Sequence, residues 1–361
     1  MSRLNHFLQG IKVVDLSRHL PGPLASLSMA EMGADVVKVE PPGGEEMRFI
    51  GPQGPNGRSA YFDAVNGNKT GLQLNLKDTA DREVFLNLLA DADVLLESFR
   101  PGVLTKLDLS IEFLRETFPQ LIICSLNGYG SNSPLVDDVG HDLNYLAMNG
   151  VLDGTGTAQE AVAPWPPLAD CAAGLYGLST VLAAIVERSR TGVGCQIEVA
   201  LADSVMPLMA FPLADLALTG QGTPRAQALL NGGAARYRTY LTKDQYSVAL
   251  GAVEPKFWRN FCLACGREDW IARIDEPLPQ RALQADVAGF FAQLTLAECN
   301  ARFAAVDCCY NAVLPLAEAV ETPHIQQRKL VINTPDGACQ ALYPAYVDGE
   351  APLPRKGFTE R

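Results

Sequence analysis

The sequence lacks a long hydrophobic run, an excess of basic side chains and a recognisable leader. Its 361 residues include 41 acidic and 29 basic side chains, for a formal net charge of −12. This balance argues against a broad nucleic-acid-binding face, which would be basic. The most apolar stretch, 171–186, is interrupted by glycine, serine and threonine and falls short of the roughly 20 residues of a membrane span. The first ten residues hold no apolar run of the signal-peptide type. We therefore expect a buried helix at 171–186 and a cytoplasmic protein with neither a membrane nor a nucleic-acid partner.

Cysteine and glycine patterns exclude further classes. The nine cysteines are odd in number and scattered, so they do not form a disulfide framework. Cys262 and Cys265 form a lone C-x-x-C without the extra ligands of a zinc site, and core positions are expected for both. Neither a phosphate-binding loop nor G-x-G-x-x-G follows a strand, which argues against a bound dinucleotide.

What the sequence does contain is an alternation of strands and helices. Strands are expected at 11–16, 35–39, 72–76, 94–97, 121–125 and 196–201, and helices at 21–32, 80–89, 111–117, 142–148, 172–188 and 202–218. Short apolar strands separated by helices predict an α/β fold with a parallel, Rossmann-like sheet. We place this large domain at 1–220. A hairpin at 237–240 and 246–249 and helices at 255–265, 284–293 and 296–304 predict a smaller α+β domain at 225–330.

Histidine is scarce, so each of the four is a candidate acid or base. His141 follows a polar loop and precedes the short helix 142–148, and a helix N-terminus favours neutral imidazole, which can act as a base. His19 lies in the first strand-to-helix turn, at the strand end where open α/β sheets bind ligands. A capping or loop-anchoring role is the alternative for His141.

Two carboxylates also lie at helix starts. Asp170 immediately precedes the apolar stretch, where burial would raise its pKa. Its alternative role is that of an N-cap. Glu254 lies between an apolar strand and the helix 255–265, and it too fits a carboxylate at a helix start.

Several motifs carry a resemblance to a known family. The turn Pro21-Gly-Pro, the segment that begins Gly33-Ala-Asp-Val-Val-Lys-Val-Glu, the motifs Arg100-Pro-Gly-Val and Gly128-Tyr-Gly, and Arg190-Thr-Gly-x-Gly194 resemble the family III coenzyme A transferases. Within that superfamily, Gly140-His-Asp-Leu-Asn-Tyr145, Asn231-Gly-Gly233 and Gly251-Ala-Val-Glu-Pro-Lys-Phe257 are most similar to the α-methylacyl-CoA racemases. The resemblance covers essentially the whole chain.

The resemblance implies a fold, an assembly and a reaction. It implies an interlocked homodimer and a C-terminal tail, 331–361, that returns to the large domain. The implied substrate is a 2-methylacyl-CoA thioester, so coenzyme A enters with the substrate and no separate cofactor or metal is expected. His141 and Asp170 would be the acid–base pair and Glu254 the partner that orients or charges His141. The implied substrate-binding residues are Gly140, Asp142, Asn144, Tyr145, Lys69, Gln73, Glu97, Phe99, Arg100, Lys106, Gly232 and Gly233.

Departures from the racemase pattern leave alternatives open. Pro41 stands where racemases often place an arginine for the CoA phosphates, and Lys38 or Arg48 are candidates to replace it, along with the basic residues above. Pro166 and Cys195 also depart from the usual residues. The alternatives are a CoA-transferase that uses Asp170 as its nucleophile and a catalytically silent acyl-CoA-binding protein. Backbone N–H groups at the start of the Asp170 helix are expected to hold the enolate oxygen, and Met206, Met209 and Phe211 are candidate contacts of the acyl chain.

Overall fold

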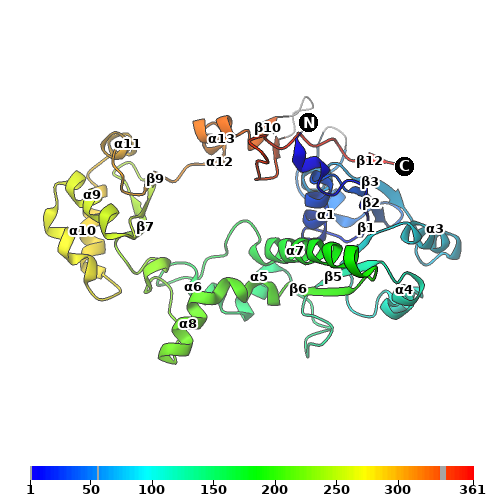
Figure 1. Ribbon diagram of the computed structural model, residues 1–361. Coiled ribbons are helices and arrows are strands. Elements are labelled where there is room, and N and C mark those ends of the chain that lie inside the picture. The colour runs from blue at the N-terminus through cyan, green and yellow to red at the C-terminus, as the bar shows by residue number, and fades with distance from the viewer. Residues whose placement is uncertain (1, 55–56, 334–338) are drawn as a thin grey trace. The chain divides into compact units, whose positions relative to one another are not determined.

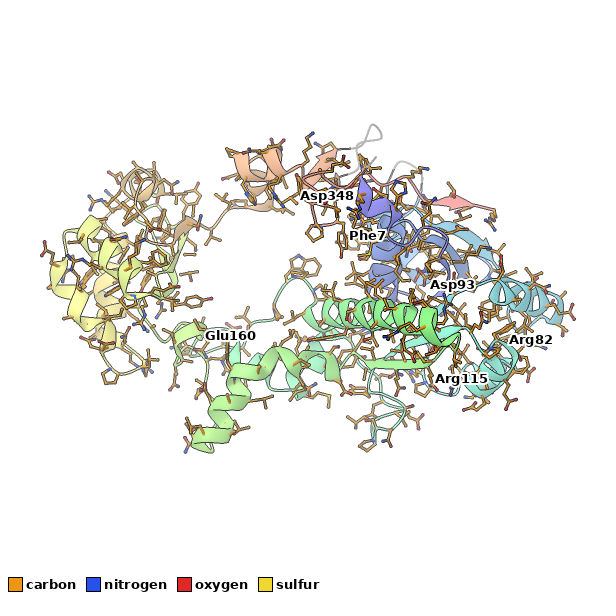
Figure 2. The ribbon with its side chains drawn as sticks, viewed as in Figure 1. Phe7, Arg82, Asp93, Arg115, Glu160 and Asp348 are labelled. Atoms are coloured by element: carbon orange, nitrogen blue, oxygen red, sulfur yellow. The ribbon has the colours of Figure 1, made fainter. Side chains whose placement is uncertain are left out.

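The computed structural model describes residues 2–54, 57–333 and 339–361, which form two compact units. The first unit contains the described residues of 1–146, 165–208 and 320–361, and the second contains 147–164 and 209–319. Segment 147–164, in which Glu160 is labelled in Figure 2, therefore packs outside the expected 1–220 domain. Arg225 ties it to the second unit through an ion pair with Asp153 at 3.0 Å. Residues 320–330 belong to the first unit rather than to the expected 225–330 domain.

A seven-stranded parallel sheet forms the centre of the first unit, which confirms the predicted α/β fold (Figure 1). Its order is β12-β3-β2-β1-β4-β5-β6, and neighbouring strands pair in parallel. The strands are β1 Lys12–Leu16, β2 Asp35–Glu40, β3 Thr70–Gln73, β4 Val94–Glu97, β5 Ile122–Asn127, β6 Gln196–Ala200 and β12 Thr359–Glu360. The strand expected at 72–76 ends instead at Gln73, where the chain turns away after the Leu74 N–H donates to the Glu40 carbonyl.

The first unit contains the helices η1 Arg3–His6, α1 Pro21–Glu31, η2 Glu46–Phe49, α2 Ala60–Asn66, α3 Thr79–Ala90, η3 Thr105–Leu107, α4 Ile111–Thr117, α7 Leu168–Thr191, η4 Asp203–Val205 and α13 Pro323–Arg328. Of these, α1, α3, α4 and α7 lie within four residues of the bounds expected from the sequence. The short α5, Asp142–Met148, begins in the first unit and ends in the second. Phe99 and Arg100 follow the carboxyl end of β4, and the segment after β5 leads to Gly140 and His141.

Helix α7 packs on α1 and on strands β5 and β6 (Figure 1). Small residues allow this close approach, because a Cβ at Gly174 would lie 2.7 Å from the Pro21 carbonyl oxygen. The helix is less buried than expected, since Leu175 is 55 % and Val186 is 60 % exposed. By length and composition alone, α7 is long and apolar enough to cross a membrane. This is weak evidence for a membrane span, because a helix that packs on a sheet passes the same test.

The C-terminal segment completes the sheet of the first unit. Strand β12 pairs with β3, and Phe358 packs edge-on against Phe62 with ring centroids 5.1 Å apart. Arg355 forms a buried ion pair with Glu31 at 2.8 Å. Two further strands, β10 Val331–Asn333 and β11 Cys339–Ala341, form a separate antiparallel pair. The segment 331–361 is thus part of the first unit wherever it is described.

The second unit is built on a three-stranded antiparallel sheet of β7 Tyr237–Leu241, β8 Ser247–Gly251 and β9 Tyr310–Ala312. Its helices are α6 Val151–Gly154, α8 Ala210–Thr219, η6 Leu229–Asn231, α9 Pro255–Cys265, η7 Glu268–Asp275, α10 Arg281–Phe291, α11 Leu296–Phe303 and α12 Leu316–Ala319, with η5 Pro207–Met209 at the unit boundary. Stacked aromatic rings around Phe261 fill the core, where Cys262 and Cys265 are buried as expected. All nine cysteines are free. The helix expected at 202–218 begins only at 210, after two 3₁₀ turns around Pro207.

Candidate functional site

His141 immediately precedes α5 and is held there by its own backbone. Its N–H donates to the Asn144 side-chain oxygen at 3.1 Å, and its carbonyl accepts from the Asn144 N–H at 2.8 Å. The backbone is therefore anchored by Asn144, and the imidazole is exposed. The structure thus shows that Asn144 fixes the backbone of His141, and its expected contact with substrate stays a prediction.

Asp170 lies in the first turn of α7, but it does not cap that helix. The cap is Asp142, whose Oδ1 accepts from the backbone N–H groups of Ala169 at 2.6 Å and Asp170 at 3.3 Å. The N-cap alternative for Asp170 is therefore wrong, and its carboxylate is available for another role. Of the N–H groups at the helix start that were expected to hold an enolate oxygen, those of Ala169 and Asp170 already donate to Asp142.

The surroundings of Asp170 raise the pKa of its carboxyl group toward neutral pH. Burial raises the pKa of Asp170 to about 6, the negative charge of Asp142 raises it too, and His141 acts in the opposite direction. A carboxyl group with a pKa near neutral pH is suited to accept a proton in one step and to donate it in another. Burial, with a smaller contribution from the charge of Asp142, thus gives Asp170 an acidity that would suit proton transfer.

Two tyrosines form the wall beside His141. The Tyr145 hydroxyl donates to the Gly140 carbonyl at 2.7 Å, and its ring meets Tyr129 edge-on at 5.2 Å. A Cβ at Gly140 would lie 2.6 Å from the Tyr129 hydroxyl and 2.8 Å from the Tyr145 ring, so any larger residue would have to displace a tyrosine. Burial raises the pKa of Tyr145 to about 12, which keeps its phenol protonated.

These residues line one cavity of about 240 Å³ in the first unit. Of the residues predicted from the sequence, it brings together Gly140, His141, Tyr145, Asp170 and Arg100. It also contains His19 and Arg18, from the turn after β1. Arg18 was missed in the sequence analysis, although the rule that singled out His19, the carboxyl end of a parallel strand, applies equally to its neighbour.

A second cavity, of about 200 Å³, lies at the ends of β1, β2 and β4. Leu16, Val39 and Leu76 give it an apolar floor, and the predicted residue Phe99 lines it. Arg18 also lines it, with its guanidinium carbon 5.1 Å from the centre of the Phe99 ring. Arg18 therefore borders both cavities.

Three basic residues expected to meet CoA phosphates are buried in ion pairs instead. Lys69 pairs with Asp15 at 3.1 Å, Lys38 with Glu45 at 2.8 Å, and Arg48 with Glu40 at 2.6 Å. Both lysines have no exposed side-chain surface. The expectation for Lys69, and for Lys38 and Arg48 as replacements, is therefore wrong, because a buried and paired cation cannot reach a solvated phosphate.

Other predicted contacts serve the fold or lie outside these cavities. Gln73 accepts a hydrogen bond from the Gly43 N–H, and the buried Glu97 accepts one from the Phe99 N–H at 2.8 Å. Burial raises the pKa of Glu97. Lys106 is exposed on η3 and lines neither cavity. For Gln73 and Glu97 the structure thus shows local positioning where ligand contacts were expected.

Glu254, Gly232 and Gly233 belong to the second unit. Glu254 is exposed at the N-cap position of α9 and forms no side-chain cap. Gly232 has a φ of +96° and lines a cavity of that unit, whereas Gly233 is packed so closely that a Cβ would lie 2.3 Å from the Gln227 backbone. Gly233 is thus a structural residue of the turn.

The role of Asp142 gives a prediction for the Asp142→Asn variant. The amide keeps the oxygen that caps α7 but removes the negative charge, so the pKa of Asp170 is expected to fall below about 6. A carboxyl-carbon NMR titration measures it directly. Asp138→Asn removes a charge from the same cavity wall and serves as the control. An unchanged Asp170 titration in Asp142→Asn would contradict this account.

Comparisons with known proteins agree with the fold and find both a racemase and a CoA-transferase among the relatives of this chain. The model of the family described as CoA-transferase family III matches residues 8–352. The chain is 34% identical over 331 residues to human alpha-methylacyl-CoA racemase, covering 91% of this chain and 83% of that protein. It is 34% identical over 243 residues to mouse succinyl-CoA:glutarate CoA-transferase, covering 67% and 56%. The crystal structure of a CaiB/BaiF family protein from Brucella suis superposes with a TM-score of 0.85 at 27% identity, covering 98% and 96%.

Proposed function

The chain belongs to CoA-transferase family III, and from this membership we propose that it is an acyl-CoA racemase that inverts the α-carbon of 2-methylacyl-CoA thioesters. The observation that carries the proposal is the meeting of His141 and Asp170 in one cavity. The pKa of Asp170, raised to about 6, adds support, since racemisation needs two groups that exchange protons near neutral pH.

The reaction proceeds by proton transfer through an enolate. The thioester acidifies the α C–H bond, one of the two groups removes that proton, and the other returns a proton to the opposite face. Two groups are required because a single base would return the proton to the face it left. Inversion therefore depends on both His141 and Asp170, and Glu254, from the small domain of a second copy of the chain, is proposed to charge or orient the histidine.

Coenzyme A is proposed to lie along the carboxyl ends of the strands. The apolar part of coenzyme A would contact the apolar lining of the cavity at the ends of β1, β2 and β4, next to Phe99. Its phosphates would meet the cations that no described carboxylate neutralises, with charge-assisted hydrogen bonds. These are Lys77 and Arg18, which line that cavity, Arg100, which lines the cavity of His141, and the exposed Lys106.

A homodimer, which the family resemblance implies, and a cytoplasmic location are further parts of the proposal. The exposed apolar residues Leu175 and Val186 on α7 and Leu218 on α8 are surfaces that a second copy would cover. Phe211 on α8, the candidate acyl-chain contact, is 75 % exposed as well.

The deciding experiment incubates the protein with one enantiomer of a 2-methylacyl-CoA in D₂O and follows the α-proton by NMR. A racemase replaces the α-proton with deuterium and produces the other enantiomer. His141→Ala is expected to abolish inversion, and racemisation at the wild-type rate in that variant would sink the assignment. Asn144→Ala, which loses only the backbone anchor of His141, should retain part of the activity.

CoA transfer is the second candidate, supported by the similarity to transferases of the same family. In that reaction the Asp170 carboxylate attacks the thioester, forms a mixed anhydride and releases the CoA thiolate. Trapping of a covalent adduct at Asp170 with acyl-CoA, in the absence of α-proton exchange, would replace racemisation with transfer. If acyl-CoA binds with neither exchange nor an adduct, the protein is a binding protein.

A further inference from the structure

A cavity of about 880 Å³ lies within the second unit, between strands β7 and β8, the turn at η6 and the start of α10. Its volume is in the range of about 300–1,000 Å³ typical of small-molecule sites. The residues that line it include Arg238 and Arg281 and, among those described, neither aspartate nor glutamate. This composition stands out in a chain with a net charge of −12.

The two arginines are not neutralised by the protein. Arginines form most of the ion pairs in the described part of the chain, whereas Arg238 and Arg281 form none there. Arg238 is half-buried, and its Nε atom is buried without a hydrogen-bond partner among the described residues. Its Nη1 donates a 3.3 Å hydrogen bond to the Gly232 carbonyl, and its guanidinium lies over the Tyr240 ring, 5.6 Å from the ring centre. Because no described carboxylate pairs with this cation, a bound anion would supply the missing charge partner.

The surroundings favour an anion with a short carbon skeleton. Arg281 opens the 11-residue helix α10, whose N-terminus adds positive potential to the same wall. Leu230, Leu250 and Pro279 supply apolar surface next to the two cations. A planar guanidinium fork matches a carboxylate in a bidentate arrangement. We propose that this cavity binds the carboxylate of a small organic acid, through Arg238 and Arg281.

Cys309 also lines the cavity, and the pKa of its thiol is raised by burial and by the charges of Glu254 and Asp307. Neither of these carboxylates lines the cavity itself.

Calorimetric titration of the full-length protein tests the site with acetate, succinate and glutarate as probes. We expect saturable binding of at least one of them, weakened at least tenfold in Arg238→Gln and in Arg281→Gln. Arg259→Gln, which removes an exposed arginine of α9 outside the cavity, should bind as the wild type does. Arg238→Lys keeps the charge but loses the fork, and it replaces Arg238→Gln if circular dichroism shows that variant to be unfolded.

The controls separate this site from the catalytic one. Asp170→Asn should retain full carboxylate binding even though its activity is lost, so failure of the proposed reaction leaves this test intact. Absence of saturable binding by all three acids would overturn the proposal. Equal binding of the neutral succinamide, tighter binding of inorganic phosphate, or unchanged affinity in both arginine variants would overturn it as well.

Discussion

Asp170→Asn should lower the rate of racemisation by about 10²–10⁴-fold, the usual contribution of a positioned acid or base. The amide has nearly the shape of the carboxyl group but cannot exchange a proton, and Asp142 rather than Asp170 caps α7. The substitution therefore leaves the helix intact. Chiral chromatography of the product thioester, with kcat and KM measured separately, gives the effect, which should fall on kcat.

Isotope exchange makes this result specific. In the proposed mechanism His141 acts on one face of the α-carbon, so without the Asp170 carboxylate one enantiomer should lose its α-proton to D₂O without inversion. A variant that exchanges one enantiomer and inverts neither assigns the two groups to opposite faces. Inversion at an undiminished rate in Asp170→Asn would exclude this residue from the reaction.

Lys69→Met should destabilise the protein by about 3–5 kcal/mol, the cost of removing one partner from a buried ion pair. Burial alone would raise the pKa of Asp15, but the ammonium groups of Lys69 and Lys38 hold it well below its usual range. Without Lys69 the Asp15 carboxylate stays buried with less compensation, although Ser26 still donates to it at 2.5 Å. Equilibrium unfolding in urea measures the change as a lower midpoint.

A matched surface pair provides the control for this result. Lys12 pairs with Asp91 where both side chains are exposed, so Lys12→Met should leave the urea midpoint unchanged. The affinity of folded Lys69→Met for acyl-CoA should equal that of the wild type. A selective loss of CoA affinity with unchanged stability would instead restore Lys69 as a phosphate contact.

Local sequence signals predicted the helices around the site well. The bounds expected for α5 at 142–148 and for α9 at 255–265 are those of the structure. Pro255 is a local start signal for α9, and the left-handed Gly266 after it is a local stop signal. Such features act within a few residues, so they can be recognised without knowledge of the tertiary fold.

Residues whose role depends on distant partners were harder to assign. Lys69 and Asp15 lie 54 positions apart, and their pairing converts an apparent phosphate contact into a buried core group. Asp142 and Ala169 lie 27 positions apart, and their hydrogen bond shows that Asp142, and not Asp170, caps α7. No periodicity or motif encodes either contact, because each forms only when the sheet and its helices pack.

The sequence by itself determined the alternating α/β pattern, the membership of the family and the identity of His141, Asp170 and Glu254 as candidates. Hydrophobic periodicity and short motifs suffice for these, since both are local. The tertiary structure alone decided which cations are free, which carboxylate caps α7, and that Arg238 and Arg281 share a cavity without acids. Burial and charge pairing depend on which distant segments meet, and only the folded chain brings them together.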